Sequence, residues 1–389
     1  MTVTAAGLAP DLEAEQALLG ALLLSPPELD SVASWLRSSH FLRPAHAALY
    51  EVLLAQRTAG HPGAAEGADD KQLRDFALEA MAAAGAASRG LSPSYGASLI
   101  AACPYPRHAR AYARMVLESS IRRQVHERAH RLQHAARTGD LDGVLELTGE
   151  LRQAVHELAD LWGALDERPR PLPGPWPLEL ADAVRESTTV DEAALLSSAT
   201  AAPDGLQQIV RWLRPGDFLD RGHGAVYQAL AALARRGEPV DTLTVLWEAQ
   251  QQGAIACGAV TADGVRAATR DGFTGDPQYW GERVLRASVL RHSAASAGVV
   301  RLLARDVSLP AARLLGCALH TLGLAEAVQD RWRTADGSSL RSGPTPVPGG
   351  TDRRAAARTR VPTAALPGAS RPSPAEAATP RGSPIRSTR

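Results

Sequence analysis

The stretch WLRSSHFLRPAHAALYEVLLAQRTAGHP, residues 35–62, recurs as WLRPGDFLDRGHGAVYQALAALARRGEP, residues 212–239, at a constant offset of 177. The match extends back without a gap to Glu15 and Glu192, and it contains 18 identities in 48 positions. The shared residues include tryptophan, phenylalanine, histidine and tyrosine, which a composition biased toward alanine and arginine does not explain. The chain therefore carries two copies of one unit.

Each copy has the periodicity of helices. In the first copy an apolar stripe at helical spacing precedes Pro26, and a second stripe runs between His46 and Arg57. The stripes consist of Leu18, Leu19, Leu22 and Leu23, then Leu49, Tyr50, Leu53 and Leu54. No run of Thr, Val, Ile and Tyr alternates as a strand would, so we expect an all-α protein. The repeated aromatic side chains are expected in its core: Trp35, Trp212, Phe41 and Phe218.

Each copy then continues into two long helices joined by a short turn, which make a helical hairpin. The predicted arms are 107–137 and 141–161 in the first copy, and 277–305 and 310–332 in the second. The fold is thus two tandem helical-bundle domains, each followed by a hairpin. The predicted boundaries are a first domain at 11–161, a Pro-rich linker at 162–190, a second, divergent domain at 191–332 and a disordered Arg-, Pro- and Ser-rich tail at 333–389.

A series of short motifs runs through the first copy. They are Glu13-Ala14-Glu15-Gln16, Leu19-Gly20, Phe41, His46, Tyr50, Gly60-x-Pro62 and the run ARAYARMVLESSIRRQV at 109–125. In this order they resemble the N-terminal domain of DnaB-like replicative helicases. The resemblance covers 11–161 well and 190–332 more weakly, because the second copy has Ala193 and Ser197 where the first has Gln16 and Gly20. That erosion also fits a remnant without a retained partner.

In that family the domain is not the motor; the domains form a collar on the helicase ring, and the hairpins contact primase. The resemblance implies a non-catalytic, replication-associated interaction protein of the replisome or primosome that binds helicase, primase or itself. A P-loop ATPase requires G-x-x-x-x-G-K-[S/T]. The one lysine, Lys71, stands in GADDKQLRD, which lacks that pattern. We therefore expect no enzyme activity and no cofactor.

The segment His126-Glu127-Arg128-Ala129-His130 fits the H-E-x-x-H pattern of zinc metallopeptidases, in which two histidines one helical turn apart bind the ion. Arg128 and Arg131 would place positive charge beside that ion and oppose its binding. The second copy keeps none of the motif. A solvated polar face of the hairpin is the preferred interpretation, and a metallopeptidase with His126 and His130 as ligands is the remote alternative.

Arginines gather in two places. The first hairpin carries a candidate partner interface at Arg122, Arg123, Arg128 and Arg131. The segment 341–389 has nine arginines against two acids, a net +7, while the remainder is −7. A flexible basic segment can bind phosphate backbones without sequence specificity, although an inert tail is the competing interpretation. Under the alternative of a DNA-binding accessory protein, the candidate nucleic-acid contacts are Arg353, Arg354, Arg358 and Arg360.

The remaining features concern the compartment. The three cysteines, Cys103, Cys257 and Cys317, are scattered, which fits reduced thiols in a cytosolic protein. The longest apolar run, 17–24, is too short to span a membrane, and no secretion signal precedes it. We expect a bacterial cytoplasmic protein, free or nucleoid-associated, without a membrane partner.

Overall fold

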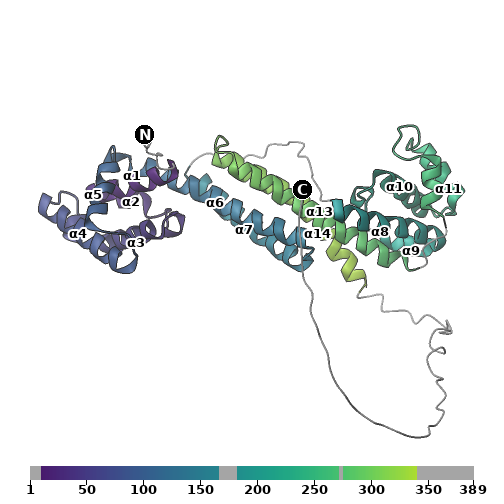
Figure 1. Ribbon diagram of the computed structural model, residues 1–389, viewed down its shortest axis with the longest axis horizontal. Coiled ribbons are helices and arrows are strands. Elements are labelled where there is room, and N and C mark those ends of the chain that lie inside the picture. The colour runs from purple at the N-terminus through teal and green to yellow at the C-terminus, as the bar shows by residue number, and fades with distance from the viewer. Residues whose placement is uncertain (1–9, 166–181, 271–274, 340–389) are drawn as a thin grey trace, which may run out of the picture. The chain divides into compact units, whose positions relative to one another are not determined.

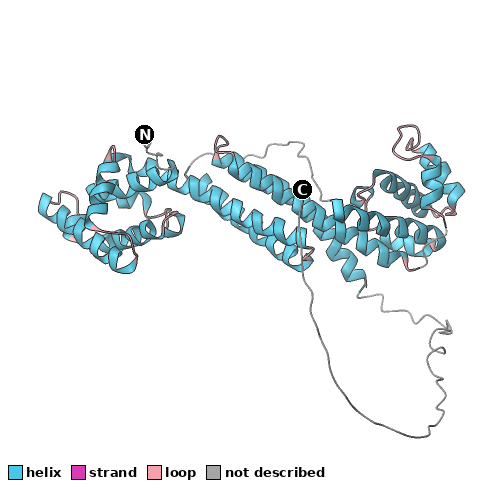
Figure 2. Ribbon diagram, in the orientation of Figure 1, coloured by secondary structure: helices cyan, strands magenta, loops and turns pink. Residues whose placement is uncertain are grey.

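The computed structural model describes residues 10–165, 182–270 and 275–339. Within these ranges the chain consists of helices and the loops that join them, with no strand (Figure 2). The all-α prediction is therefore confirmed. Most of the predicted tail and most of the predicted linker lie outside the described residues.

The first copy folds into five α-helices followed by a hairpin (Figure 1). The helices are α1 (Pro10–Leu24), α2 (Leu29–Val32), α3 (Pro44–Thr58), α4 (Asp70–Ala87) and α5 (Pro93–Ala102). Of these, α1, α3, α4 and α5 begin where the sequence supplies a proline at the first position or a capping side chain. At the start of α4, for example, the Asp69 carboxylate accepts a hydrogen bond from the backbone N–H of Gln72. The Gln72 side-chain oxygen in turn accepts one from the backbone N–H of Asp69.

The second copy follows the same order, with shorter elements at its end. Asp220 caps α10 by accepting the backbone N–H of His223, and Gly237 in the left-handed conformation ends the helix. The helices are α8 (Asp182–Ala201), α9 (Pro203–Ile209), α10 (Arg221–Arg236), α11 (Thr242–Gln251) and α12 (Ala262–Ala268).

The repeated aromatic residues form equivalent cores. Tyr50 is fully buried against Phe41, with ring centroids 5.1 Å apart, and Tyr227 lies 4.9 Å from Phe218 in the same way. Each tyrosine hydroxyl donates to a backbone carbonyl fourteen residues earlier. The repeated tryptophans, Trp35 and Trp212, are also buried. The prediction that these side chains form the core is confirmed.

Both predicted hairpins are present. In the first, α6 (Ala109–Thr138) is terminated by Gly139, whose φ of 78° lies in the left-handed region, and α7 (Leu141–Gly163) begins two residues after that glycine. In the second, α13 (Pro277–Arg305) is followed by α14 (Ala311–Ser339). The last helix continues seven residues beyond its predicted end.

The two hairpins pack against each other as a four-helix bundle. Helix α13 lies along α6, and α14 lies along both α13 and α7 (Figure 1). Arg122 on α6 donates to the carbonyls of Asp306 and Leu309 in the second hairpin's turn, and Arg286 on α13 donates to the carbonyl of Gly139 in the first turn. These reciprocal contacts mean that α6 and α13 run antiparallel, related by an approximate two-fold axis.

The bundle interior is mainly apolar but contains one polar cluster that joins the hairpins. The Gln329 amide donates to the hydroxyl of Thr148 at 2.8 Å and to that of Ser293 at 3.2 Å, and all three residues are buried. These bonds satisfy the amide only when both hairpins are in place. The segment 311–335 of α14 has the length and apolar composition of a membrane span, but here the helix packs within the bundle.

One glycine marks a difference between the copies. An added Cβ at Gly20 of α1 would lie 2.1 Å from the carbonyl oxygen of Leu99, so α5 approaches the α1 backbone directly. In the second copy Ser197 occupies this position, and its hydroxyl donates to the carbonyl of Arg270 at 2.8 Å. In the second copy the segment at Arg270 therefore contacts α8 through the Ser197 side chain rather than by direct approach of the two backbones.

We expect Gly20→Ala to destabilise the protein by about 1–3 kcal/mol, because α5 must move away from α1. Gly149→Ala is the matched control. It lies in α7 with no atom near its would-be Cβ, so it should stabilise by up to about 1 kcal/mol through helix propensity. Urea unfolding measures both. A Gly20 variant as stable as the parent would show that the close approach is not required.

Candidate interaction site

A buried glutamate organises the start of α3 in the first copy. The Glu15 carboxylate accepts the backbone N–H groups of Leu42 and Arg43, and it contacts Nδ1 of His46 at 2.7 Å. Glu15 and His46 are both buried. Because no capping side chain precedes α3, this carboxylate from α1 satisfies N–H groups that would otherwise lack partners.

The second copy reproduces this arrangement at the same offset. Glu192 accepts the backbone N–H groups of Leu219 at 2.5 Å and Asp220 at 3.3 Å, and it contacts Nδ1 of His223 at 3.0 Å. In the first copy the Tyr95 hydroxyl also bonds Nε2 of His46, at 2.7 Å. The recurrent histidine therefore binds a buried carboxylate and has a structural role in both copies.

A repeated arginine joins each domain to its hairpin. Arg123 on α6 donates to the carbonyl of His40 at 2.8 Å, and Arg291 on α13 donates to the carbonyl of Asp217 at 2.7 Å. The two arginines are equivalent when Val116-Leu117 is aligned with Val284-Leu285, an offset of 168. Burial lowers the pKa of both guanidinium groups, and nearby carboxylates oppose that shift. The charged groups remain inside because each has a carbonyl partner.

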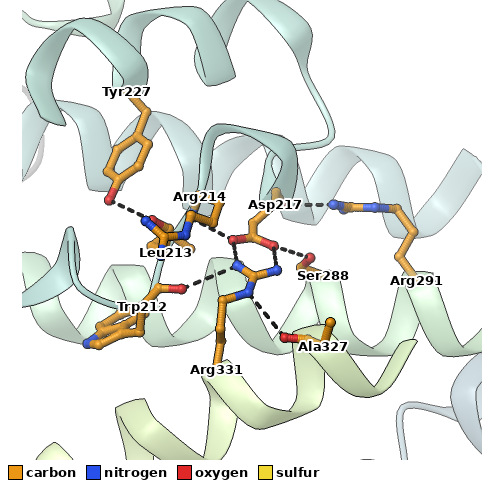
Figure 3. Close-up of polar contacts among 9 residues, drawn as sticks. All are labelled: Trp212, Leu213, Arg214, Asp217, Tyr227, Ser288, Arg291, Ala327 and Arg331. Carbon is orange, nitrogen blue, oxygen red and sulfur yellow. Dashed lines mark hydrogen bonds and ion pairs between the residues drawn. The ribbon is translucent and has the colours of Figure 1, made fainter. Parts of the chain in front are cut away.

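Asp217 is the centre of a larger polar cluster in the second copy (Figure 3). Its carboxylate accepts two bonds from the Arg331 guanidinium of α14, one from the Ser288 hydroxyl at 2.8 Å and one from the backbone N–H of Arg214 at 2.7 Å. Arg331 also donates to the carbonyl of Trp212 at 3.2 Å. Both arms of the second hairpin are thereby tied to the turn before α10.

The first copy has a neutral version of the same junction. His40 stands where the second copy has Asp217, and aligning Trp162 with Trp332 places Leu161 opposite Arg331. His40 Nδ1 accepts the backbone N–H of Arg37 at 3.1 Å, so the ring is neutral with its proton on Nε2. Burial, with a further contribution from Arg37 and Arg123, lowers the pKa of His40 to about 4. The ion pair of the second copy thus stands where the first copy has two uncharged side chains, His40 and Leu161.

The four hairpin arginines predicted as a partner interface have different environments. Arg122 and Arg123 are partly buried and bonded to backbone carbonyls within the chain. Arg128 donates to Gln124 of its own helix, and Arg131 is exposed. Arg131 is therefore the member of the group most accessible to a partner. Whether the four form an interface remains a prediction.

The predicted metal ligands lie on α6. His126 is half-buried, whereas His130 is exposed. Over the described residues no group of three or more His, Cys, Asp or Glu side chains is placed to hold a metal ion. The predicted nucleic-acid contacts Arg353, Arg354, Arg358 and Arg360 lie outside the described residues. Cys103, Cys257 and Cys317 are free thiols, as predicted.

Sequence reasoning did not identify the Asp217 cluster. A signal was available, because the exchange of His40 for Asp217 and that of Leu161 for Arg331 introduce opposite charges at equivalent places. Paired changes of that kind between repeats indicate contact. The long separation along the chain between Asp217 and Arg331 concealed it.

The fold and these junctions define a class of protein: an all-helical tandem repeat whose domains carry long hairpins that pair with each other. The family described as "DnaB-like helicase N terminal domain" matches residues 8–118 and 186–263, one segment in each copy. The chain thus contains DnaB-like helicase N-terminal domains, as the sequence motifs predicted.

A curated relative supports this assignment. The chain is 27% identical over 216 residues to the replicative DNA helicase DnaB of Mycobacterium leprae (strain TN), an alignment that covers 54% of this chain and 32% of that protein. The chain therefore matches about a third of the length of that relative. No solved structure matches the chain significantly.

The Asp217 cluster yields a test by repeat exchange. We expect Arg331→Leu to cost roughly 3 kcal/mol, because it leaves a buried carboxylate without its charged partner. The double variant Asp217→His with Arg331→Leu recreates the pair found in the first copy and should recover at least half of that loss. Urea unfolding of the parent and the variants measures this. A double variant less stable than the single one would show that the two junctions are not interchangeable.

His40 should make the protein sensitive to acid. Its folded pKa of about 4 lies below the ordinary 6.5, so the unfolded chain binds the proton first as pH falls. The contribution of the neutral His40 to the free energy of unfolding is complete above pH 6.5. It is lost progressively as the pH falls toward 4, by up to about 3 kcal/mol. His40→Asn keeps an acceptor for Arg37 without a titrating group. We expect a smaller fall in unfolding free energy between pH 7 and 5 in this variant; equal falls would contradict the assignment.

Proposed function

We propose that this protein is a non-enzymatic interaction partner of the bacterial replication machinery, acting in the cytoplasm on the replicative helicase or primase. The observation that carries the proposal is the pairing of two DnaB-like N-terminal domains through their own hairpins. One chain thereby presents two linked domains that both resemble the N-terminal domain of DnaB-like helicases. Linking two binding modules raises the effective concentration of the second contact, so a paired chain can compete for a surface that single domains bind weakly.

The pairing also affects self-association. The apolar faces of α6, α7, α13 and α14 are buried against one another, with Leu117, Val155 and Val300 fully covered. A second chain could use those faces only by opening the bundle. We therefore favour a monomer that binds a different protein over a homo-oligomer held by its hairpins.

The proposed contact surface lies on α11 of the second copy. Leu243 and Trp247 are one helical turn apart on the same face, and they are 72% and 61% exposed. Exposed tryptophans are enriched among the residues that dominate protein interfaces. The rim includes the ion pairs of Arg236 with Glu238 and Glu248, which would remain in water around an apolar centre.

Catalysis is not part of the proposal. The matched segments belong to a helicase N-terminal domain, and the sequence has no P-loop lysine pattern. The alternative, a DNA-binding accessory protein acting through Arg353, Arg354, Arg358 and Arg360, depends on residues outside those described. Its distinguishing test is removal of the basic charge between 341 and 389.

The central experiment measures mass by light scattering after gel filtration, for the protein alone and mixed with its host's replicative helicase or with primase. We expect a monomer alone and a complex of defined stoichiometry with one partner. Trp247→Ser should weaken that complex about 30-fold, as expected for loss of a residue that contributes about 2 kcal/mol.

Leu324→Ser, a change of an exposed apolar residue on α14, is the control and should leave binding unchanged. Separate elution of the unmodified protein from both partners, at low and moderate salt, would refute the proposed function. A complex that tolerates Trp247→Ser would keep the function and move the contact away from α11.

A further inference from the structure

Two rows of side chains face each other along the contact between α6 and α13. Each row has the spacing of one helix face, with successive steps of four, three and four residues. The offset of 168 relates the rows position by position, so they flank the approximate two-fold axis of the bundle. The rows are His126, His130, Gln133 and Arg137 on α6, and Ala294, Gly298, Arg301 and Arg305 on α13.

Direct contacts show that the rows meet. The Gln133 amide donates to the carbonyl of Ala294 at 3.4 Å, and the Arg301 guanidinium donates to the Gln133 side-chain oxygen. An added Cβ at Gly298 would lie 2.9 Å from the Gln133 amide nitrogen, so the glycine makes room for that side chain. At one end His126 and Arg305 line a common hollow with Ala304. We call this feature the α6–α13 groove.

The groove carries positive charge without a carboxylate in either row. Arg137, Arg301 and Arg305 are its permanent cations, and His126 and His130 lie between them. Burial lowers the pKa of Arg301, and repulsion from Arg305 and Arg137 lowers it further.

Acids near the hollow have other partners or lie on its far wall. Glu118 bonds Arg122, Asp306 bonds Ser308, and Asp11 lies on the side formed by α1. Charges of one sign held close together in this way favour an external anion.

Two buried atoms of the groove have no hydrogen-bond partner among the described residues: Nδ1 of His126 and Nε of Arg301. Arg137 and Arg305 are exposed side chains in the last turns of their helices, where they also interact favourably with the helix dipoles. The helix dipole does not account for Arg301 or the two histidines, which lie further back along the helices.

We propose that the α6–α13 groove binds the phosphodiester backbone of single-stranded nucleic acid. Arg301 and Arg305 are one turn apart, about 6 Å along the axis, so both can contact neighbouring phosphates of one strand. The arginine fork matches phosphate geometry. Neither row contains Phe, Tyr or Trp, so binding rests on charge rather than base stacking and is independent of sequence.

An acidic protein helix fits this groove less well. Helix-in-groove recognition needs several apolar anchors at helical spacing. The large exposed apolar side chains near the rows are Leu302, Met115 and Val307, which lie on α13, on α6 and in the turn after α13 and do not follow one helix face. Within the rows, Ala294 and Gly298 offer little apolar surface. The inference goes beyond the proposed function, because the groove and the α11 surface are separate and can fail separately.

The test uses the full-length protein and a fluorescein-labelled 20-nucleotide oligo(dT), with anisotropy titrations from 50 to 200 mM salt. The groove variant is Arg137→Gln with Arg305→Gln; both residues are exposed, so the fold should be retained. The control, Arg89→Gln with Arg211→Gln, changes the net charge equally at exposed positions in the two domains. Circular dichroism checks that both variants fold.

We expect the groove variant to bind at least tenfold more weakly and the control to bind nearly as well as the parent. Loss of two phosphate contacts should also reduce the slope of log K against log salt by about 1.4. Equal effects of the two double variants would overturn the proposal.

Photo-cross-linking of the unmodified protein to thio-substituted oligo(dT) gives a second measurement that requires no variant. Cross-links in peptides from α6 and α13 support the groove, whereas cross-links confined to 341–389 refute it. A poly-glutamate peptide that binds as tightly as oligo(dT), with the same loss in the groove variant, would assign the surface to an acidic protein instead.

Discussion

The burial of two hairpins against each other is the constraint on which the rest of this structure depends. A two-helix hairpin has one apolar stripe per arm and cannot cover both stripes alone. Here each hairpin covers the other, and the equivalent residues Ala129 and Ala297 are fully buried near the two-fold axis. Small residues at this position let α6 and α13 approach closely. Each hairpin's turn then meets the first arm of the other, where Arg122 and Arg286 bond its carbonyls.

The bundle fixes how each domain is attached, and the two attachments have diverged. In both attachments, an arginine of the hairpin's first arm donates a hydrogen bond to a backbone carbonyl of the domain. The second copy adds the Asp217–Arg331 ion pair, whereas the first has the neutral His40 and a leucine at the positions equivalent to these two residues. A buried ion pair contributes less net stability than its short contacts suggest, because both charges lose their hydration. Its more evident effect is on geometry, since Asp217 also requires Ser288 and the Arg214 N–H in place.

The sequence was sufficient to predict the elements and their order but not their association. Apolar periodicity, prolines and Gly139 located the hairpin arms to within two residues, except at the end of α14, since those signals are local. The repeat identified Trp35 and Phe41 as core residues because both recur at one offset. It did not reveal that Glu15 caps α3, because a glutamate 27 residues before its N–H partner has no local signature. Pairing of the hairpins was hidden for a similar reason: apolar stripes do not specify which surface covers them.

The divergence of the rows in the α6–α13 groove shows what a tandem chain permits that a homodimer does not. In a pair of identical hairpins, each residue near the axis faces itself, so Gln133 would meet Gln133 and His130 would meet His130. In this chain Gln133 meets Arg301, which donates to it, and Gly298 gives Gln133 the space that a second histidine would occupy. Such complementarity is available only to unlike partners joined in one polypeptide. The two hairpins of this chain are therefore complementary to each other at these positions rather than identical.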